Sequence, residues 1–94
     1  MSTSNFEWNE ANNLENQEKH GVSFAEAQHA FLDQNRVIAE DLEHSQNEIR
    51  YYCFGKDKDG AGILTVRFTY RAGRIRIIGA GYWRRGKQLY EKSN

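Results

Sequence analysis

Few side chains in this sequence can exchange protons near neutral pH, and they limit the chemistry open to the chain. Imidazole is the side chain suited to this role, and the sequence has three histidines, His20, His29 and His44. Their spacing matches no metal-binding motif, and the single Cys53, which we expect to be buried and inert, cannot form a Cys-x-x-Cys pair. The sequence therefore predicts acid–base chemistry with no metal site and no cofactor.

Two of the histidines fit either a catalytic or a structural role. His20 falls at the end of a predicted helix, where it can carry protons or simply cap the helix C-terminus. His44 falls in a polar connection over 41–47, where it can exchange protons or order the turn. We expect His29, on the outer side of a second helix, to be solvated. His20 and His44 are thus the candidates for proton transfer.

A carboxylate and a guanidinium two residues apart form another candidate pair. Glu48 and Arg50 fall on an extended segment, where alternate side chains point to the same side. They fit a catalytic base with its orienting partner, and they also fit a structural ion pair with a neighbouring strand. Both interpretations stay open at the level of the sequence.

Length and composition restrict the class of protein. Ninety-four residues that are 38% hydrophobic and 28% charged suit one soluble globular domain over 1–94. No stretch approaches the roughly 18 apolar residues of a membrane span, and the polar opening at 1–5 lacks the features of a secretory signal. We therefore expect a cytoplasmic protein.

The net charge of zero conceals a polarity along the chain. Residues 1–49 carry ten acids and two bases, whereas residues 50–94 carry three acids and eleven bases. Such an asymmetry indicates a polyanionic partner for the second half, unless folding places the two halves against each other.

The apolar pattern predicts an α+β fold. Asn9 and Gly21 suit the two ends of a polar surface helix whose sparse apolar stripe includes Ala11 and Leu14. A capping box at 23–26 starts a second helix, and from residue 36 the apolar period changes to two. The expected elements are a short strand at 6–8, helices at 10–20 and from 24, strands at 36–40, 50–55, 63–70 and 74–80, and a short C-terminal helix at 83–91. We therefore expect two N-terminal helices packed on an antiparallel sheet of about four to five strands.

The last hairpin has a register that the residue pattern specifies. If residues 72–73 form the loop, Arg71 pairs with Arg74 and, in step, Arg67 with Ile78. One face of the hairpin is then apolar, because a slip by one residue would mix the two faces. The other face carries Arg67, Arg71, Arg74 and Arg76. Guanidinium groups in such a cluster suit phosphate binding, unless the acidic first half neutralises them.

A second basic group lies near the C-terminus, among aromatic residues. Such a mixture is typical of surfaces on which unpaired bases stack. For Trp83 and Tyr90, however, helical spacing favours core packing. The candidate RNA-binding residues of this group are Tyr82, Arg84, Arg85 and Lys87.

Several stretches occur in an order and spacing that a known family shares. They are Phe6-Glu7-Trp8 ahead of a helix, Lys19-His20-Gly21-Val22-Ser23-Phe24 with Glu26-Ala27, Asp41-Leu42-Glu43-His44-Ser45 with Glu48 and Arg50, and Arg74-Ile75-Arg76-Ile77-Ile78 with Tyr90-Glu91. Together they resemble the BrnT family of ribonuclease toxins over nearly the whole chain. Many members continue from the Ile-Ile strand into a serine and an arginine-rich run, whereas here residues 79–83 intervene.

The resemblance implies a RelE-like fold and metal-independent RNA cleavage that inhibits translation. It also implies a ribbon-helix-helix antitoxin that neutralises the toxin and binds DNA, so that the chain meets DNA only through its partner and meets no membrane. We therefore expect an endoribonuclease of a type II toxin–antitoxin system. Its predicted catalytic residues are His20, His44, Glu48, Arg67 and Arg76, and its predicted RNA-binding residues are Arg50, Arg71, Arg74, Tyr82, Arg84, Arg85 and Lys87.

A catalytically weak or inactive RNA- or protein-binding module on the same fold is the alternative. In that case the basic face would dock an acidic partner segment. A DNA-binding regulator acting alone fits poorly, because no predicted helix is basic enough to enter a groove.

Overall fold

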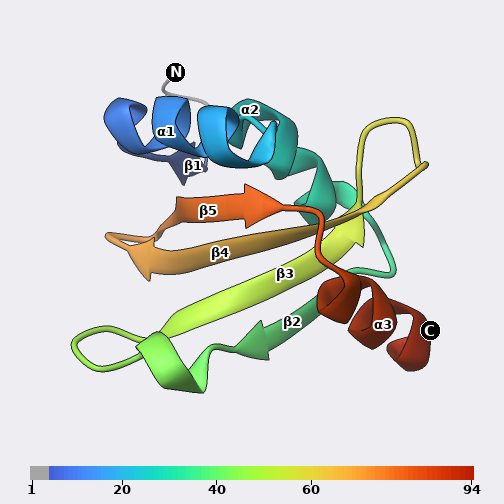
Figure 1. Ribbon diagram of the computed structural model, residues 1–94. Helices are drawn as coiled ribbons and strands as arrows, with labels where there is room; N and C mark the ends of the chain where they lie inside the picture. Colours follow the sequence, from blue (N-terminus) through green and yellow to red (C-terminus); the bar gives the residue numbers. More distant parts are fainter. Residues whose placement is uncertain (1–4) are drawn as a thin grey trace.

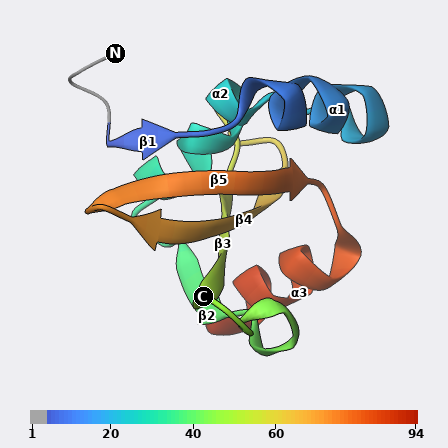
Figure 2. The same ribbon diagram turned by 90° about the vertical axis from the view of Figure 1, so that its left-hand side faces the viewer.

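The computed structural model describes residues 5–94 and confirms the α+β class. Its elements in chain order are β1 (Phe6–Glu7), α1 (Glu10–His20), α2 (Phe24–Ala27), the 3-10 helix η1 (Gln28–Leu32), β2 (Val37–Glu40), the 3-10 helix η2 (Leu42–His44), β3 (Arg50–Lys56), β4 (Ile63–Arg71), β5 (Arg74–Gly81) and α3 (Arg84–Ser93). The strands form one sheet in the order β1-β5-β4-β3-β2 (Figure 1). Figure 2 shows α1 and α2 on one side of the sheet and α3 on the other.

The expected ends of the first two helices are confirmed. The Asn9 side chain accepts a hydrogen bond from the backbone N–H of Asn12, and Gly21 ends α1 with φ 69°. Ser23 and Glu26 form the reciprocal capping box ahead of α2. The second α-helix is shorter than its apolar pattern predicts, because after Ala27 the chain continues as the 3-10 helix η1.

The prediction of an apolar stripe on α1 is wrong. Leu14 is 58% exposed and Ala11 is also exposed, whereas the buried residues of this helix are Asn13 and Asn16. Asn16 donates hydrogen bonds to the carbonyl oxygens of Val22 (2.8 Å) and Ala80 (2.9 Å). It also accepts one from the Ala80 N–H (3.2 Å). Side-chain amides therefore dock α1, because they satisfy backbone groups that no neighbouring strand reaches.

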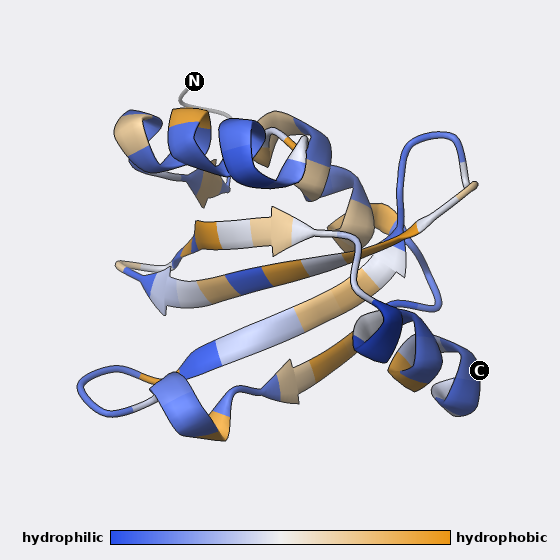
Figure 3. Ribbon diagram, viewed as in Figure 1, coloured by the Kyte–Doolittle hydropathy of each residue, from blue (hydrophilic) through white to orange (hydrophobic). Residues whose placement is uncertain are grey.

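The core lies between α2–η1 and the sheet. Its members are buried apolar side chains that include Val22, Phe24, Ala27, Ala30, Cys53, Leu64, Val66, Phe68 and Ile77. Figure 3 shows apolar residues recurring along the strands, whereas α1 is largely hydrophilic. The expected burial of Cys53 is confirmed, and burial raises the pKa of its thiol to about 12. This thiol therefore stays protonated and inert.

The hairpin register is confirmed near the turn and wrong beyond it. Arg71 pairs with Arg74, and Ala72 and Gly73 both have positive φ, as a two-residue turn of this kind requires. A register shift then places Arg67 opposite Gly79, where we expected Ile78. The physical reason is a β-bulge, which adds one residue to β5 and leaves it unpaired.

The sheet differs from the expected purely antiparallel one at its β1 edge. Phe6 and Glu7 pair with Ile75 and Arg76 in the parallel direction, while the other strand pairs are antiparallel. Among residues 5–94, no helix has the length and apolar character needed to cross a membrane. Residues 1–4 of the polar opening lie outside the described part, and the RelE-like detail of the fold stays a prediction.

Candidate active site

Five arginines share the sheet side on which α3 lies. Their registers place them at alternate strand positions or directly opposite one another, so their side chains project from the same side. We refer to this group as the arginine face, and its members are Arg50, Arg67, Arg71, Arg74 and Arg76. The predicted clustering of guanidinium groups is therefore confirmed.

The arginine face is not a free cationic surface, because three acids of the first half of the chain lie beside it. These acids are Glu7 on β1, Asp41 after β2 and Glu48 before β3. The pairs are Arg76–Glu7 at 3.1 Å, Arg74–Glu7 at 3.7 Å, Arg71–Glu48 at 3.0 Å, Arg50–Glu48 at 3.7 Å and Arg67–Asp41 at 3.7 Å. The acidic half of the chain therefore neutralises much of the charge of the arginine face, which is one of the two alternatives that the charge pattern of the sequence allows.

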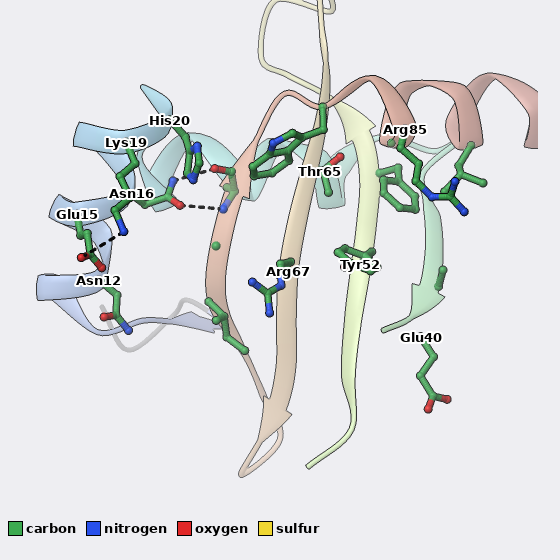
Figure 4. Close-up of a pocket in the computed structure, with 18 residues that line it drawn as sticks. Asn12, Glu15, Asn16, Lys19, His20, Glu40, Tyr52, Thr65, Arg67 and Arg85 are labelled. Carbon is green, nitrogen blue, oxygen red and sulfur yellow. Dashed lines mark hydrogen bonds and ion pairs between the residues drawn. The ribbon is translucent and has the colours of Figure 1, made fainter. Parts of the chain in front are cut away.

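One cleft of about 710 Å³ opens on this side of the sheet. Its volume lies within the range of about 300 to 1,000 Å³ that is typical of ligand sites. Figure 4 shows side chains of α1 on one side, Arg67 and Tyr52 on the strands of the floor, and Arg85 of α3 on the opposite side. The fold therefore brings together His20, Arg67 and Arg85 from three elements far apart in the chain.

His20 reaches the cleft because of how α1 is docked. It lies four residues after Asn16, one helical turn further along the same face, and Asn16 is fixed to the end of β5. The His20 ring contacts the Trp83 ring edge to face, with centroids 5.0 Å apart. Within residues 5–94 the imidazole makes no hydrogen bond, so both ring nitrogens are available to a ligand.

Arg67 on the cleft floor is held by a buried carboxylate. The Asp41 side chain is 3% exposed and lies 3.7 Å from Arg67 Nε. This Nε is buried and makes no hydrogen bond among the described residues, whereas 30% of the Arg67 side chain as a whole is exposed. Tyr52 lies beside both groups. Burial and the negative charge of Asp41 raise the pKa of Tyr52 despite the opposing charge of Arg67, so its hydroxyl stays protonated.

Close packing at Gly86 seats α3 against the sheet. A Cβ at this position would collide with Thr65 Oγ1 and lie 3.0 Å from the Phe54 ring. The preceding residue, Arg85, lines the cleft. Within the described part of the chain, Arg84, Arg85 and Lys87 have no carboxylate at ion-pair distance. The unpaired positive charge of the site therefore comes from α3.

Four of the other predicted residues, His44, Glu48, Arg50 and Arg71, gather in a second, smaller hollow, which we call the outer pocket. It is lined by Glu43, His44, Glu48, Arg50 and Arg71 together with two amides. His44 Nδ1 lies 2.8 Å from Asp41 Oδ2, and Glu48 accepts two hydrogen bonds from Arg71 Nη2, at 3.0 and 3.1 Å. His44 and Glu48 are thus apart from His20 and already hold intramolecular partners.

Five further predicted residues line neither hollow, namely Arg74, Arg76, Tyr82, Arg84 and Lys87. Arg74 and Arg76 contact Glu7 at the β1 edge. Tyr82 donates a hydrogen bond of 2.9 Å to Asp57 in the β3–β4 loop. Burial and this bond raise the pKa of Tyr82 to about 12.

Sequence reasoning did not assign three residues that the structure places at the site. Asp41 and Tyr52 support Arg67, and Trp83 lines the cleft with 42% of its surface exposed. The core packing expected for Trp83 is therefore wrong, whereas that for Tyr90, which is 5% exposed, is confirmed. The spacing of Asp41 and His44, three residues apart in a polar loop, was the one signal that could have identified Asp41.

Among residues 5–94, no group of three or more histidine, cysteine or carboxylate side chains is arranged to hold a metal ion. A family model described as "Ribonuclease toxin, BrnT, of type II toxin-antitoxin system" matches residues 8–86. A search of curated proteins gave no match.

Proposed function

The chain belongs to the BrnT family of ribonuclease toxins of type II toxin–antitoxin systems, and from this premise we propose that it is an endoribonuclease whose active site is the cleft between α1 and α3. The observation that carries the proposal is the convergence of His20, Arg67 and Arg85 on one cleft. Cleavage of RNA without a metal needs a proton acceptor for the 2′-hydroxyl, a donor for the leaving oxygen and positive charge around the phosphate.

His20 fits the proton acceptor. Its ring nitrogens have no hydrogen-bond partner among residues 5–94, and an imidazole exchanges protons near neutral pH. In the proposed step, the 2′-oxygen of the RNA loses its proton to His20 and attacks the adjacent phosphorus. The bond from phosphorus to the 5′-oxygen breaks as the new bond forms.

Arg67 and Arg85 fit the cationic part of the site. Arg67 lies on the floor with 30% of its side chain exposed, so its guanidinium can donate to a phosphate oxygen while Asp41, 3.7 Å from the buried Nε, holds its position. Arg85 lies on the α3 side and brings a charge that no described carboxylate neutralises. Tyr52 is the protonated hydroxyl beside Arg67, and we assign to it the proton for the leaving oxygen.

The direct test is incubation of the purified protein with RNA in excess EDTA. We expect cleavage, with products that end in a 2′,3′-cyclic phosphate and a 5′-hydroxyl, as attack by the 2′-oxygen requires. A His20→Ala preparation purified in the same way controls for contaminating nucleases. RNA that stays intact at all protein concentrations would contradict the enzymatic proposal and favour a non-catalytic binding module.

A type II system includes an antitoxin, so a cognate antitoxin and an RNA substrate follow from the family. We propose the finer points, which are a ribbon-helix-helix antitoxin and inhibition of translation in the cytoplasm, from the resemblance alone. Expression in a bacterial cell tests them: we expect growth arrest that is relieved by co-expression of the neighbouring small open reading frame. Growth that is unaffected by the chain would contradict the toxin role.

A further inference from the structure

Trp83 occupies an unusual place for a tryptophan in a small domain. It lines the cleft and is 42% exposed. Its ring lies against the backbone of β5, where a Cβ on Gly81 would be 2.6 Å from Trp83 Cη2 and 2.7 Å from Cζ3. The indole therefore needs a glycine beneath it in order to lie at the wall of the cleft.

Trp8, the other tryptophan of the chain, has the contacts of a residue with a structural role. The Trp8 ring packs edge to face on Phe24, 6.2 Å between centroids, and its indole N–H donates a hydrogen bond of 3.2 Å to Glu10. The Trp83 indole N–H donates to no group among residues 5–94. Trp8 thus has partners for its ring and its N–H, while Trp83 keeps both exposed surface and an available donor.

We propose that Trp83 is the surface on which one unpaired nucleobase of the substrate stacks, so that the cleft selects single-stranded RNA. This inference rests on the proposed function. Stacking on an aromatic ring is the common way in which proteins hold unpaired bases, because every base has a π face. The partner is therefore defined by its chemistry, an accessible base on a phosphodiester chain.

The neighbours of Trp83 determine where the sugar and phosphate of a stacked base would lie. His20 contacts its ring on one side, and Arg85, two residues further along, lines the same cleft. Arg67 lies on the floor. A base on Trp83 would thus hold its own sugar and phosphate among His20, Arg67 and Arg85, which Figure 4 labels around the cleft. A paired base cannot use this surface, because its faces are covered by its neighbours in the duplex.

The test uses fluorescence of the Trp8→Phe variant, in which Trp83 is the remaining tryptophan. The ligand is a short single-stranded RNA in which every 2′-hydroxyl is methylated, so that it binds without being cleaved. We expect saturable quenching of Trp83 emission. The same oligonucleotide with abasic sites, and the same sequence in a duplex, should quench at least tenfold more weakly at equal concentration.

Substitutions at two positions, 83 and 81, separate stacking from mere structural support. Trp83→Leu should weaken binding of the methylated oligonucleotide, followed by polarisation of a labelled strand, by about tenfold or more, and Trp83→Phe should restore most of it. Gly81→Ala should weaken binding as well, because the new Cβ displaces the ring while the ring itself is kept. The matched control is Tyr70→Leu, which removes an aromatic ring that is 57% exposed on the opposite face, and should leave binding unchanged.

The outcomes distinguish this inference from the proposed function. If abasic and intact strands quench equally, or if Trp83→Leu binds as tightly as the parent, the stacking proposal is overturned even where RNA is cleaved. If stacking is observed but RNA is never cut, the stacking proposal stands and the enzymatic one fails. Thermal melting of each variant shows that it is folded, and Gly81→Ala provides the answer should Trp83→Leu fail to fold.

Discussion

The cleft and the outer pocket are built from the same kinds of residues but differ in how their charges are satisfied. Each contains a histidine and at least one arginine of the arginine face, and Asp41 contacts His44 of the outer pocket and Arg67 of the cleft. In the outer pocket, His44 already contacts a carboxylate and Glu48 already holds Arg71. In the cleft, His20 and Arg85 have no such partner among residues 5–94.

The difference shows which charges a ligand can use. A guanidinium that is bonded to a carboxylate must lose that bond before it can bind a phosphate, and the net charge that it offers is close to zero. Arg85 has no such cost, and Arg67 makes no hydrogen bond to Asp41, which lies 3.7 Å away, although that carboxylate offsets part of its charge. Residue type and sheet face alone therefore do not identify the site, because they are shared by both regions.

The largest expected effect is that of Arg67→Gln. Loss of a donor that acts on the charge of the transition state reduces kcat by about 100-fold to 1,000-fold. The matched control is Arg71→Gln on the same strand and face, which we expect to stay within about threefold. Single-turnover cleavage of a labelled RNA measures both. Equal losses in the two variants would contradict the distinction between the cleft and the outer pocket.

The second largest expected effect is the difference in cleavage rate between the His20 and His44 variants. His20→Ala removes the proposed proton acceptor, and we expect about 100-fold slower cleavage at neutral pH. His44→Ala removes a partner of Asp41 outside the cleft, and its rate should fall by less than about threefold. If His44→Ala were the slower enzyme, the outer pocket would be the catalytic site and His20 a helix-capping residue.

Arg85→Ala should have a smaller effect that depends on salt. Loss of one phosphate contact weakens binding about tenfold at low salt. It also reduces by about one the number of phosphate contacts that the slope of log affinity against log salt concentration gives. Titration of the methylated oligonucleotide at several salt concentrations measures it. Lys92→Ala, an exposed cation in the last turn of α3, is the control, and an equal change there would indicate a general charge effect.

The smallest expected effect concerns the anchor of α3, which forms one wall of the cleft. Tyr90 donates a hydrogen bond of 2.6 Å to Asp33. Burial acts to raise the pKa of Asp33, but this bond and the backbone N–H groups of Lys56 and Asn35 outweigh it and lower the pKa below 3.8. A lowered folded pKa adds stability above about pH 4, and that stability is lost as the pH falls through the folded value.

Tyr90→Phe should therefore lower the free energy of unfolding by about 1 kcal/mol at neutral pH and weaken the loss of stability in acid. Urea unfolding at pH 7 and below pH 4 measures both quantities. Asn94→Ala, which removes another contact of α3 with the loop before β2, is the comparison and should leave the acid dependence intact. An acid dependence unchanged in Tyr90→Phe would show that Asp33 is not the group responsible.

The sequence by itself determined the local features of this protein. Caps at Asn9, Gly21 and Ser23, the turn at 72–73 and the alternation that puts the arginines on one face all depend on neighbours a few residues apart, so their physical cause is visible in the sequence. Even there, the register shift between Arg67 and Phe68 changed the pairing of Arg67, because the extra residue of β5 falls in the apolar run at 77–80, where no polar residue marks the change in alternation.

Only the tertiary structure decided which charges are paired and which are left for a ligand. Arg76 meets Glu7 across 69 positions of the chain, and Arg71 meets Glu48 across 23. Such contacts depend on strand order and on helix docking, which in turn depends on the amide of Asn16 and the close approach at Gly86. Since the energy of an ion pair is set by distance in space, sequence separation carries no information about it.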